Sequence, residues 1–200
     1  MPTEHRERNC GGEEVIKRSI DIGVSLVVLV LTLPFFAMIA LFIRLETKGP
    51  VIFKQERVGL RGTSFLIYKF RSMVEDAASQ GPHVTSYNDP RITGVGRVIR
   101  KISLDELPQM LNVLSGDMSI VGPRPNVPIQ RIEYTEEEWE KRNTVRPGIT
   151  GLAQAQLRST ATPEERTRLD LEYVDKASIG YDLWVILLTA KQVIFLHGNN

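Results

Sequence analysis

The sequence predicts an α/β protein that is mostly helical, with one small β-hairpin and a membrane-embedded N-terminal segment. Three observations support this fold class: a run from Ile22 to Ile43 without a charged residue, β-forming residues on both sides of the turn cluster 59–62, and repeated helix signals elsewhere. The chain has 200 residues, enough for one domain with its own core. We divide it into a flexible N-terminus (1–14), the membrane segment (15–47) and a globular domain (48–200).

The charge-free run is long enough to cross a bilayer, but two features complicate a simple span. As a helix, its 22 residues would measure about 33 Å. Pro34 lies near the middle and is expected to kink the helix, although the Thr32 hydroxyl could pair with a freed carbonyl. Lys and Arg residues stand on both sides of the run, at 17–18 and within 44–48, so the flanking charges give no orientation. The residues leave two alternatives, a single-pass anchor or a re-entrant hairpin with both ends on one face.

The net charge of +1 conceals an uneven distribution of charge along the chain. Residues 44–101 hold eleven Lys and Arg against five Asp and Glu, whereas residues 102–200 hold ten against fourteen. A basic segment next to an apolar one indicates anionic partners, such as lipid headgroups or phosphates. The basic residues form no nucleic-acid-binding motif, so no nucleic acid is expected as a partner. The single cysteine, Cys10, excludes an intrachain disulfide.

The segment from Val51 to Met73 predicts the β-hairpin, with Gly59 to Gly62 as its turn. Lys69, near the end of the second strand, is expected to face either phosphate or solvent. Gly94-Val95-Gly96 is not a dinucleotide-binding motif, because Ile99 stands where a third glycine would be needed and no βαβ unit surrounds it. We interpret these glycines as a turn before a short helix.

Two adjacent acids, Asp105 and Glu106, form the most informative stretch of the sequence. Ser103 and Glu106 fit a capping box before an apolar helix over 107–114. Pro108 would then lie past the first helical turn, so a later start near Asp105 suits the proline better. In either case the carboxylates lie at the positive end of a helix. An aspartate held ionised beside a metal-binding glutamate can act as a nucleophile towards phosphorus; the alternative is that the pair only caps the helix.

The rest of the chain predicts two stiff loops, around Arg124 and over 146–151, and three helices. Prolines on both sides of Arg124 fix its backbone, which suits either a bidentate phosphate ligand or an exposed arginine in a rigid loop. The charged helix over 133–142 is interpreted as a solvated face. Thr162 and Pro163 open a helix that runs to about Lys176. The last helix, 182–196, either lies in a membrane interface or packs on the core.

Four motifs occur in this order after the apolar segment: Ser-Leu-Asp-Glu-Leu-Pro-Gln (103–109), Gly-Asp-Met-Ser (116–119), Val-Gly-Pro-Arg-Pro (121–125) and Arg-Pro-Gly-Ile-Thr-Gly (146–151). Together they resemble the bacterial sugar transferases. More narrowly, they resemble the small monotopic phosphoglycosyl transferases that initiate surface glycan assembly. The resemblance covers about residues 15–195. Four motifs with compatible spacing are not expected to agree by chance.

The resemblance implies a specific reaction. Such enzymes transfer a phospho-sugar from a UDP-sugar to a polyprenyl phosphate such as undecaprenyl phosphate, release UMP and need Mg²⁺. Asp105 would be the nucleophile that forms a covalent phospho-sugar intermediate, and Glu106 would bind Mg²⁺. Further positions that match residues linked with the active site or with substrate binding are Lys69, Arg124, Gln154, Arg158 and Asp170.

The resemblance also implies a location and a topology. The segment 15–47 would be a re-entrant helix broken at Pro34, and 48–200 a cytoplasmic catalytic domain with interfacial amphipathic helices, on the inner membrane of a bacterium and in contact with its lipid. The chain could also pair with a second copy of itself as a homodimer. Two departures from the family pattern are Leu33, where serine usually precedes the proline, and Gln156-Leu157-Arg158 in place of Asn-Gly-Arg. The second departure means that the sugar cannot be inferred from relatives.

Two other functions compete with the transferase. A membrane-bound phosphohydrolase would use the same Asp105 intermediate with water as the acceptor. A membrane-anchored scaffold would use Asp105 and Glu106 only as helix caps, and the exchange of Asp105 for asparagine would then change stability by at most about 1 kcal/mol.

Overall fold

The computed structural model describes residues 3–77, 80–81, 89–157 and 162–195. It is a mostly helical α/β fold with small sheets and a long apolar N-terminal helix, as the sequence predicts. The elements in chain order are α1 (Thr3–Glu46), β1 (Ile52–Val58), η1 (Leu60–Gly62), β2 (Ser64–Phe70), α2 (Gly94–Lys101), η2 (Leu104–Glu106), α3 (Gln109–Ser115), β3 (Ser119–Val121), η3 (Pro128–Glu133), α4 (Glu136–Arg142), β4 (Gly148–Thr150), α5 (Leu152–Leu157), α6 (Pro163–Lys176) and α7 (Ile179–Phe195), where η marks a 3-10 helix.

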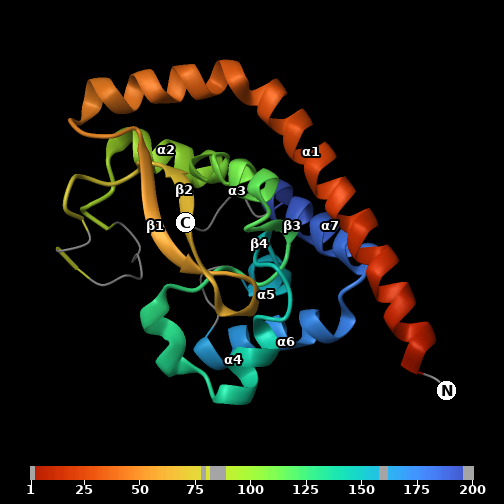
Figure 1. Ribbon diagram of the computed structural model, residues 1–200. Helices are drawn as coiled ribbons and strands as arrows, with labels where there is room; N and C mark the ends of the chain where they lie inside the picture. The colour runs from red at the N-terminus through yellow and green to blue at the C-terminus, as the bar shows by residue number, and fades with distance from the viewer. Residues whose placement is uncertain (1–2, 78–79, 82–88, 158–161, 196–200) are drawn as a thin grey trace.

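Helix α1 is one continuous helix that bends beyond its midpoint, so that the arm before the bend is the longer one (Figure 1). It begins at Thr3, so it includes most of the segment that we expected to be flexible, and Pro34 lies inside it rather than between two separate helices. The ring of Pro34 displaces the carbonyl of Val30, four residues earlier. The Thr32 hydroxyl donates instead to the carbonyl of Val28, at 2.6 Å, so Thr32 does not have the expected role of pairing the freed carbonyl.

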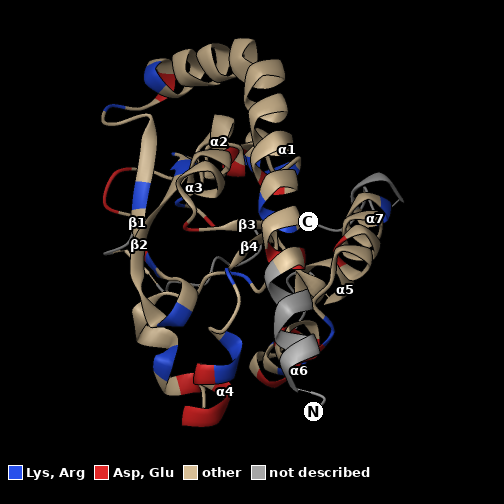
Figure 2. Ribbon diagram, turned by 45° about the vertical axis from the view of Figure 1, so that its right-hand side comes forward, with Lys and Arg blue, Asp and Glu red and all other residues tan. Residues whose placement is uncertain are grey.

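Helix α1 contacts the globular part of the protein on both sides of its charge-free run. Before the run, Arg18 donates to the carbonyl of Val113, at 2.5 Å, in α3. At the other end, the carboxylate of Glu46 accepts from the backbone N–H of Gly94, at 2.6 Å, at the start of α2. Between Ile22 and Ile43 the helix has no charged residue, and it presents exposed apolar side chains (Figure 2). Within the described residues, the helix over Gly12–Glu46 is long and apolar enough to cross a membrane.

The predicted β-hairpin is confirmed. Strands β1 and β2 pair antiparallel, with Phe53 opposite Lys69 and Val58 opposite Ser64. Phe70, at the end of β2, packs with Ile43 of α1 and with α2 in one of the hydrophobic clusters. The C-terminal part of α1 is therefore held against the strand that carries Lys69.

A second sheet was not predicted from the sequence. Strands β3 and β4 pair in parallel, with Ser119 opposite Gly148 and Val121 opposite Thr150. The chain approaches itself very closely here: a Cβ atom on Gly148 would lie 2.1 Å from the backbone nitrogen of Gly122, and one on Gly151 would lie 2.3 Å from the Gly122 oxygen. These distances explain why glycines occur in both motifs, and they place the loops after β3 and β4 side by side.

We expect the exchange Gly148→Ala to lower the free energy of unfolding by about 3 kcal/mol, because the added methyl group meets backbone rather than a movable side chain. Chemical unfolding in detergent would measure the loss. Gly180→Ala is the matched control, since a Cβ atom there meets nothing within 4 Å and Gly180 lies in helix α7; it should leave stability unchanged or raise it by at most about 1 kcal/mol. Equal stability of the two variants would contradict the close packing of the strands.

The remaining helices follow their sequence signals with one exception. Helix α6 begins at Pro163 with Thr162 as its cap, as predicted. The glycine pair 94–96 does not form a turn before α2 but its first helical turn, where Gly96 lies against the backbone oxygen of Ser72. Helix α7 packs on the core, as one of the two alternatives predicts, because Val185 is fully buried; Leu187 on the same helix is 69% exposed.

Candidate active site

The two acids lie in η2, the short helix between α2 and α3. Ser103 adopts a left-handed backbone conformation (φ 57°) and its side chain makes no cap bond, so the capping box is not formed. Helix α3 begins only at Gln109, with Pro108 as its cap residue. Both expected starts, at Ser103 and near Asp105, are therefore too early, and the carboxylates do not cap a regular helix.

Glu106 is bound by two cations from different parts of the chain. The ammonium group of Lys69 and the guanidinium of Arg124 both donate to Oε1 of Glu106, at 2.8 Å and 2.9 Å. Burial alone would raise the pKa of Glu106, but the charges of Arg124 and Lys69 outweigh it and hold the pKa well below its usual range. Lys69 is thus not a solvated strand end, and Arg124 is not a free arginine in a rigid loop.

Asp105 differs from its neighbour although the two residues are adjacent. Its side chain is buried, and burial together with the negative charge of Glu106 raises its pKa to about 6, against the opposite effect of Lys69 and other cations. The carboxylate is still mostly ionised at pH 7. The site therefore holds one carboxylate that is fixed by ion pairs and one that is ionised but poorly stabilised, which is a suitable state for a nucleophile.

Arg57 is a site residue that the sequence analysis missed. It lies on β1 and donates to the carbonyl of Pro125, at 2.9 Å, next to Arg124. Burial and the charge of Arg124 lower the pKa of Arg57 to about 10. The hairpin register contains the signal that could have found it: Phe53 is opposite Lys69, so Arg57 and Lys69 share one face of the sheet. Three cations thus gather around two carboxylates, an arrangement suited to an anion with several charges.

Arg124 is held in place by a buried ion pair. Arg142 donates to the backbone carbonyl of Arg124, at 2.5 Å, and to Oδ2 of Asp170 through Nε, at 2.9 Å. Arg142 and Asp170 are each only 2% exposed. The prediction of a solvated face for 133–142 is therefore wrong at Arg142, and Asp170 is not surface. A chain of contacts through Arg142 and Arg124 thus connects Asp170 with Glu106.

Gln154 lies in α5, behind the loops that follow β3 and β4. Its Nε2 donates to the carbonyl of Ile149, at 3.1 Å. Its Oε1 is buried and has no hydrogen-bond partner among the residues that the structure describes. The position where Gly151 would carry a Cβ atom is 2.9 Å from this oxygen. The structure thus brings together Lys69, Asp105, Glu106 and Arg124, and it places Gln154 beside the loops; Arg158 lies outside the described residues.

Few acidic side chains are available at this site to bind Mg²⁺. Within the described ranges, no group of three or more His, Cys, Asp or Glu side chains is arranged to hold a metal ion. Mg²⁺ commonly binds through one or two protein carboxylates and completes its shell with water and substrate phosphates. Glu106, the residue expected to bind Mg²⁺, could supply one such carboxylate.

Comparison with known proteins shows the family of the chain. The family described as "Bacterial sugar transferase" matches residues 12–196. The chain belongs to this family. It is 41% identical over 184 residues to a protein of Bacillus subtilis named "Uncharacterized sugar transferase EpsL", covering 92% of this chain and 90% of that protein.

Two larger relatives carry names that state an activity. An "Undecaprenyl-phosphate glucose phosphotransferase" of Komagataeibacter xylinus is 42% identical over 190 residues, covering 90% of this chain and 36% of that protein. A "UDP-glucose:undecaprenyl-phosphate glucose-1-phosphate transferase" of Escherichia coli is 40% identical over 186 residues, covering 90% of this chain and 40% of that protein. The chain therefore spans well under half the length of these two relatives.

Proposed function

We propose that the protein is a phosphoglycosyl transferase that moves a sugar phosphate from a UDP-sugar to undecaprenyl phosphate and releases UMP. The observation that carries the proposal is the pairing of Glu106 with Lys69 and Arg124 directly beside the ionised Asp105. The names of the E. coli and K. xylinus relatives support the class of donor and acceptor. The lipid-linked product would be the first membrane intermediate of a surface glycan, such as an exopolysaccharide, capsule or O-antigen.

In the first half-reaction, a carboxylate oxygen of Asp105 attacks the phosphorus that carries the sugar. A bond forms between that oxygen and phosphorus, the bond from phosphorus to the UMP oxygen breaks, and UMP leaves with the electron pair. A carboxylate and a diphosphate repel each other. Lys69, Arg124 and Arg57 surround the acid pair with positive charge, which reduces this repulsion and stabilises the charge that develops on phosphorus.

In the second half-reaction, a phosphate oxygen of undecaprenyl phosphate attacks the same phosphorus. The bond between Asp105 and phosphorus breaks, and the carboxylate is restored. This sequence is a ping-pong scheme with a covalent intermediate. Bound Mg²⁺ would neutralise part of the diphosphate charge, and Glu106, with Asp105 beside it, would hold the ion. Glu106 suits this task because its low pKa keeps it ionised.

We further propose that α1 enters the membrane and returns on the same side. Arg18 and Glu46, which lie on the two sides of the charge-free run, both contact the globular domain. A folded domain lies on one side of a bilayer, so these contacts support the re-entrant alternative over the single-pass anchor. The exposed apolar stretch between the ends would then lie in lipid. UDP-sugars are soluble, and we place the domain on the cytoplasmic face of the bacterial inner membrane.

Cysteine labelling in sealed inverted vesicles tests this topology. In a Cys10→Ser background, single cysteines replace Thr3 in α1 or Glu140, which is exposed in α4. We expect a membrane-impermeant maleimide to label both positions from the outside of inverted vesicles, because both lie on the cytoplasmic face. Labelling of Thr3→Cys only after the vesicles are opened would indicate a spanning helix.

Release of UMP is the direct test of the reaction. Purified protein in nanodiscs would be mixed with Mg²⁺, undecaprenyl phosphate and a panel of UDP-sugars. We expect UMP that depends on the lipid for at least one sugar, with a lipid-linked diphosphosugar as the product. Free sugar phosphate as the product would identify a phosphohydrolase instead. The absence of both UMP and a phospho-sugar adduct on the protein would favour the scaffold.

A further inference from the structure

A cavity of about 550 Å³ lies between the first arm of α1 and helix α7, outside the acid site. Its walls carry apolar side chains from both helices, including Val24 of α1 and Ile186 of α7, and Ile120 of β3 forms part of the floor. This volume is in the usual range for binding sites of small organic ligands, roughly 300–1,000 Å³. The proposed reaction has no assigned place for the hydrocarbon part of its acceptor, so this cavity is a candidate for it.

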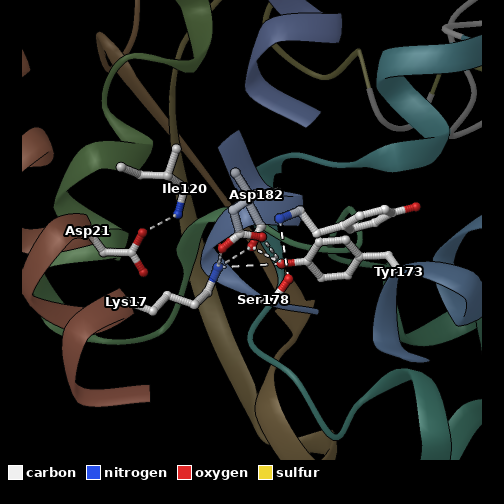
Figure 3. A network of polar contacts seen from close by, with 8 residues as sticks. Lys17, Asp21, Ile120, Tyr173, Ser178 and Asp182 are labelled. Atoms are coloured by element: carbon white, nitrogen blue, oxygen red, sulfur yellow. Dashed lines mark hydrogen bonds and ion pairs between the residues drawn. The ribbon is translucent and has the colours of Figure 1, made fainter. Parts of the chain in front are cut away.

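The polar groups that line the cavity are already paired with one another. Figure 3 shows Lys17 and Tyr173 converging on Asp182 from opposite sides. The Tyr173 hydroxyl donates to Asp182 at 2.6 Å, and Lys17 forms an ion pair with the same carboxylate. Asp21, which also lines the cavity, accepts from the backbone N–H of Ile120 at 3.1 Å. Because these groups satisfy each other, the cavity suits a hydrocarbon ligand rather than a polar one.

The rim of the cavity is continuous with the surface that we place in the membrane. Ile20 and Val24 of α1 and Leu183 and Ile186 of α7 line the cavity and are also exposed. A lipid chain could therefore enter from the bilayer without crossing water. This continuity favours a membrane lipid over a soluble apolar ligand, because a soluble ligand would have to pass through the bilayer before it reached the cavity.

The cavity borders the two strands that precede the loops of Arg124 and Gln154. Val121 and Thr150, which end the paired strands β3 and β4, line the cavity. Arg124 follows Val121 by three residues, and Gln154 follows Thr150 by four. A chain in the cavity thus lies beside the strands from which the catalytic loops extend. An ordinary phospholipid would gain nothing from this position, whereas the acceptor must keep its chain in the membrane and its phosphate near Asp105.

We propose that this cavity binds the part of the polyprenyl chain that is next to the phosphate of the acceptor lipid. The assignment rests on the proposed transferase function and adds the binding site of the lipid to it. The Lys17–Asp182–Tyr173 contacts fix the spacing of α1 and α7, and so they set the width of the cavity.

Tryptophan substitutions that fill the cavity test the assignment. Val24→Trp fills it from α1, and Ala190→Trp fills it from α7; both positions line the cavity and are exposed, so the fold should tolerate them. Matched controls are Val27→Trp and Leu187→Trp, on the same two helices but outside the lining. The ping-pong scheme allows the two half-reactions to be measured separately: UMP release in a single turnover without lipid, and transfer to undecaprenyl phosphate.

We expect both cavity variants to raise the KM for undecaprenyl phosphate by about tenfold or more, the equivalent of about two buried methylene groups. The single-turnover release of UMP should remain unchanged, and the controls should behave as the wild type. An unchanged KM in both cavity variants would overturn the assignment. If the cavity variants also lost co-purified phospholipid while the KM stayed unchanged, the occupant would be an ordinary lipid.

A binding experiment separates failure of this inference from failure of the proposed function. A polyprenyl phosphate with a diazirine on its first isoprene units would be cross-linked to the wild-type protein in nanodiscs. We expect labelled peptides from α1 around Val24 and from α7 around Ile186, whether or not UMP is released. Labelling confined to other surfaces would refute the cavity as the lipid site, and labelling here without any turnover would leave the site standing while the transferase proposal falls.

Discussion

The exchange Asp105→Asn is expected to abolish UMP release, with a loss of about 10⁴-fold or more, because the amide cannot form the bond to phosphorus. The fold should remain intact. The Asp105 carboxylate is buried beside Glu106 and its pKa is raised, so its charge opposes folding at pH 7. Asparagine has nearly the same shape and no charge. The variant should therefore unfold at the same temperature as the wild type or at a slightly higher one.

The matched control is Asp175→Asn, an exposed aspartate on α6 that pairs with Lys141 away from the acid site. It should retain full activity. Mass spectrometry of the wild type after incubation with a UDP-sugar and Mg²⁺ should show the mass of a phospho-sugar on the peptide that contains Asp105, and none on the Asp105→Asn protein. An active Asp105→Asn enzyme would refute the assignment of the nucleophile. A phospho-sugar on Glu106 would transfer that role to its neighbour.

Elements whose signals are local were predictable from the sequence. The hairpin has a glycine-containing turn between two β-forming runs, and helix α6 has its cap and first-turn proline in adjacent positions. The β3–β4 sheet lacks such a signal. Each strand has three residues, and their partner lies 29 residues away at the pair Ser119–Gly148. Alternation over three residues cannot be distinguished from a loop, and parallel pairing leaves no turn that marks the partner.

The sequence likewise indicated some residues of the candidate site and missed others. Asp105 and Glu106 are recognisable through the motif over 103–109, and the predicted hairpin places Lys69 near the end of a strand. Arg142 was missed because it stands at the end of a helix whose other residues are mostly exposed charges, so the local pattern indicates a solvated face. Its burial results from Asp170, 28 residues later, which no local pattern connects to it. Ser103 shows the same limit, since its left-handed conformation prevents the capping box that its spacing suggests.

Removal of the buried carboxylate in Asp170→Ala is expected to lower the free energy of unfolding by about 3–5 kcal/mol, because it leaves the charge of Arg142 buried without its partner. Activity should also fall, since Arg142 would no longer be held against the carbonyl of Arg124. Asp175→Ala is the control on the same pair of helices. Its partner Lys141 and Asp175 itself are exposed, so the loss of their ion pair should cost less than about 1 kcal/mol.

The double variant Arg142→Met with Asp170→Leu decides whether Asp170 acts through Arg142 or contacts the substrate. It removes both charges and replaces them with apolar side chains of similar size, so much of the stability should return relative to Asp170→Ala. The carbonyl of Arg124 would still lack its donor, so we expect activity to stay low, with the loss mainly in UMP release during a single turnover. If Asp170 instead binds the nucleotide-sugar directly, Asp170→Asn should raise the KM for the UDP-sugar with little loss of stability. Low activity in a stable double variant, together with an unstable Asp170→Asn protein, would identify the buried pair as the support that holds Arg124 against Glu106.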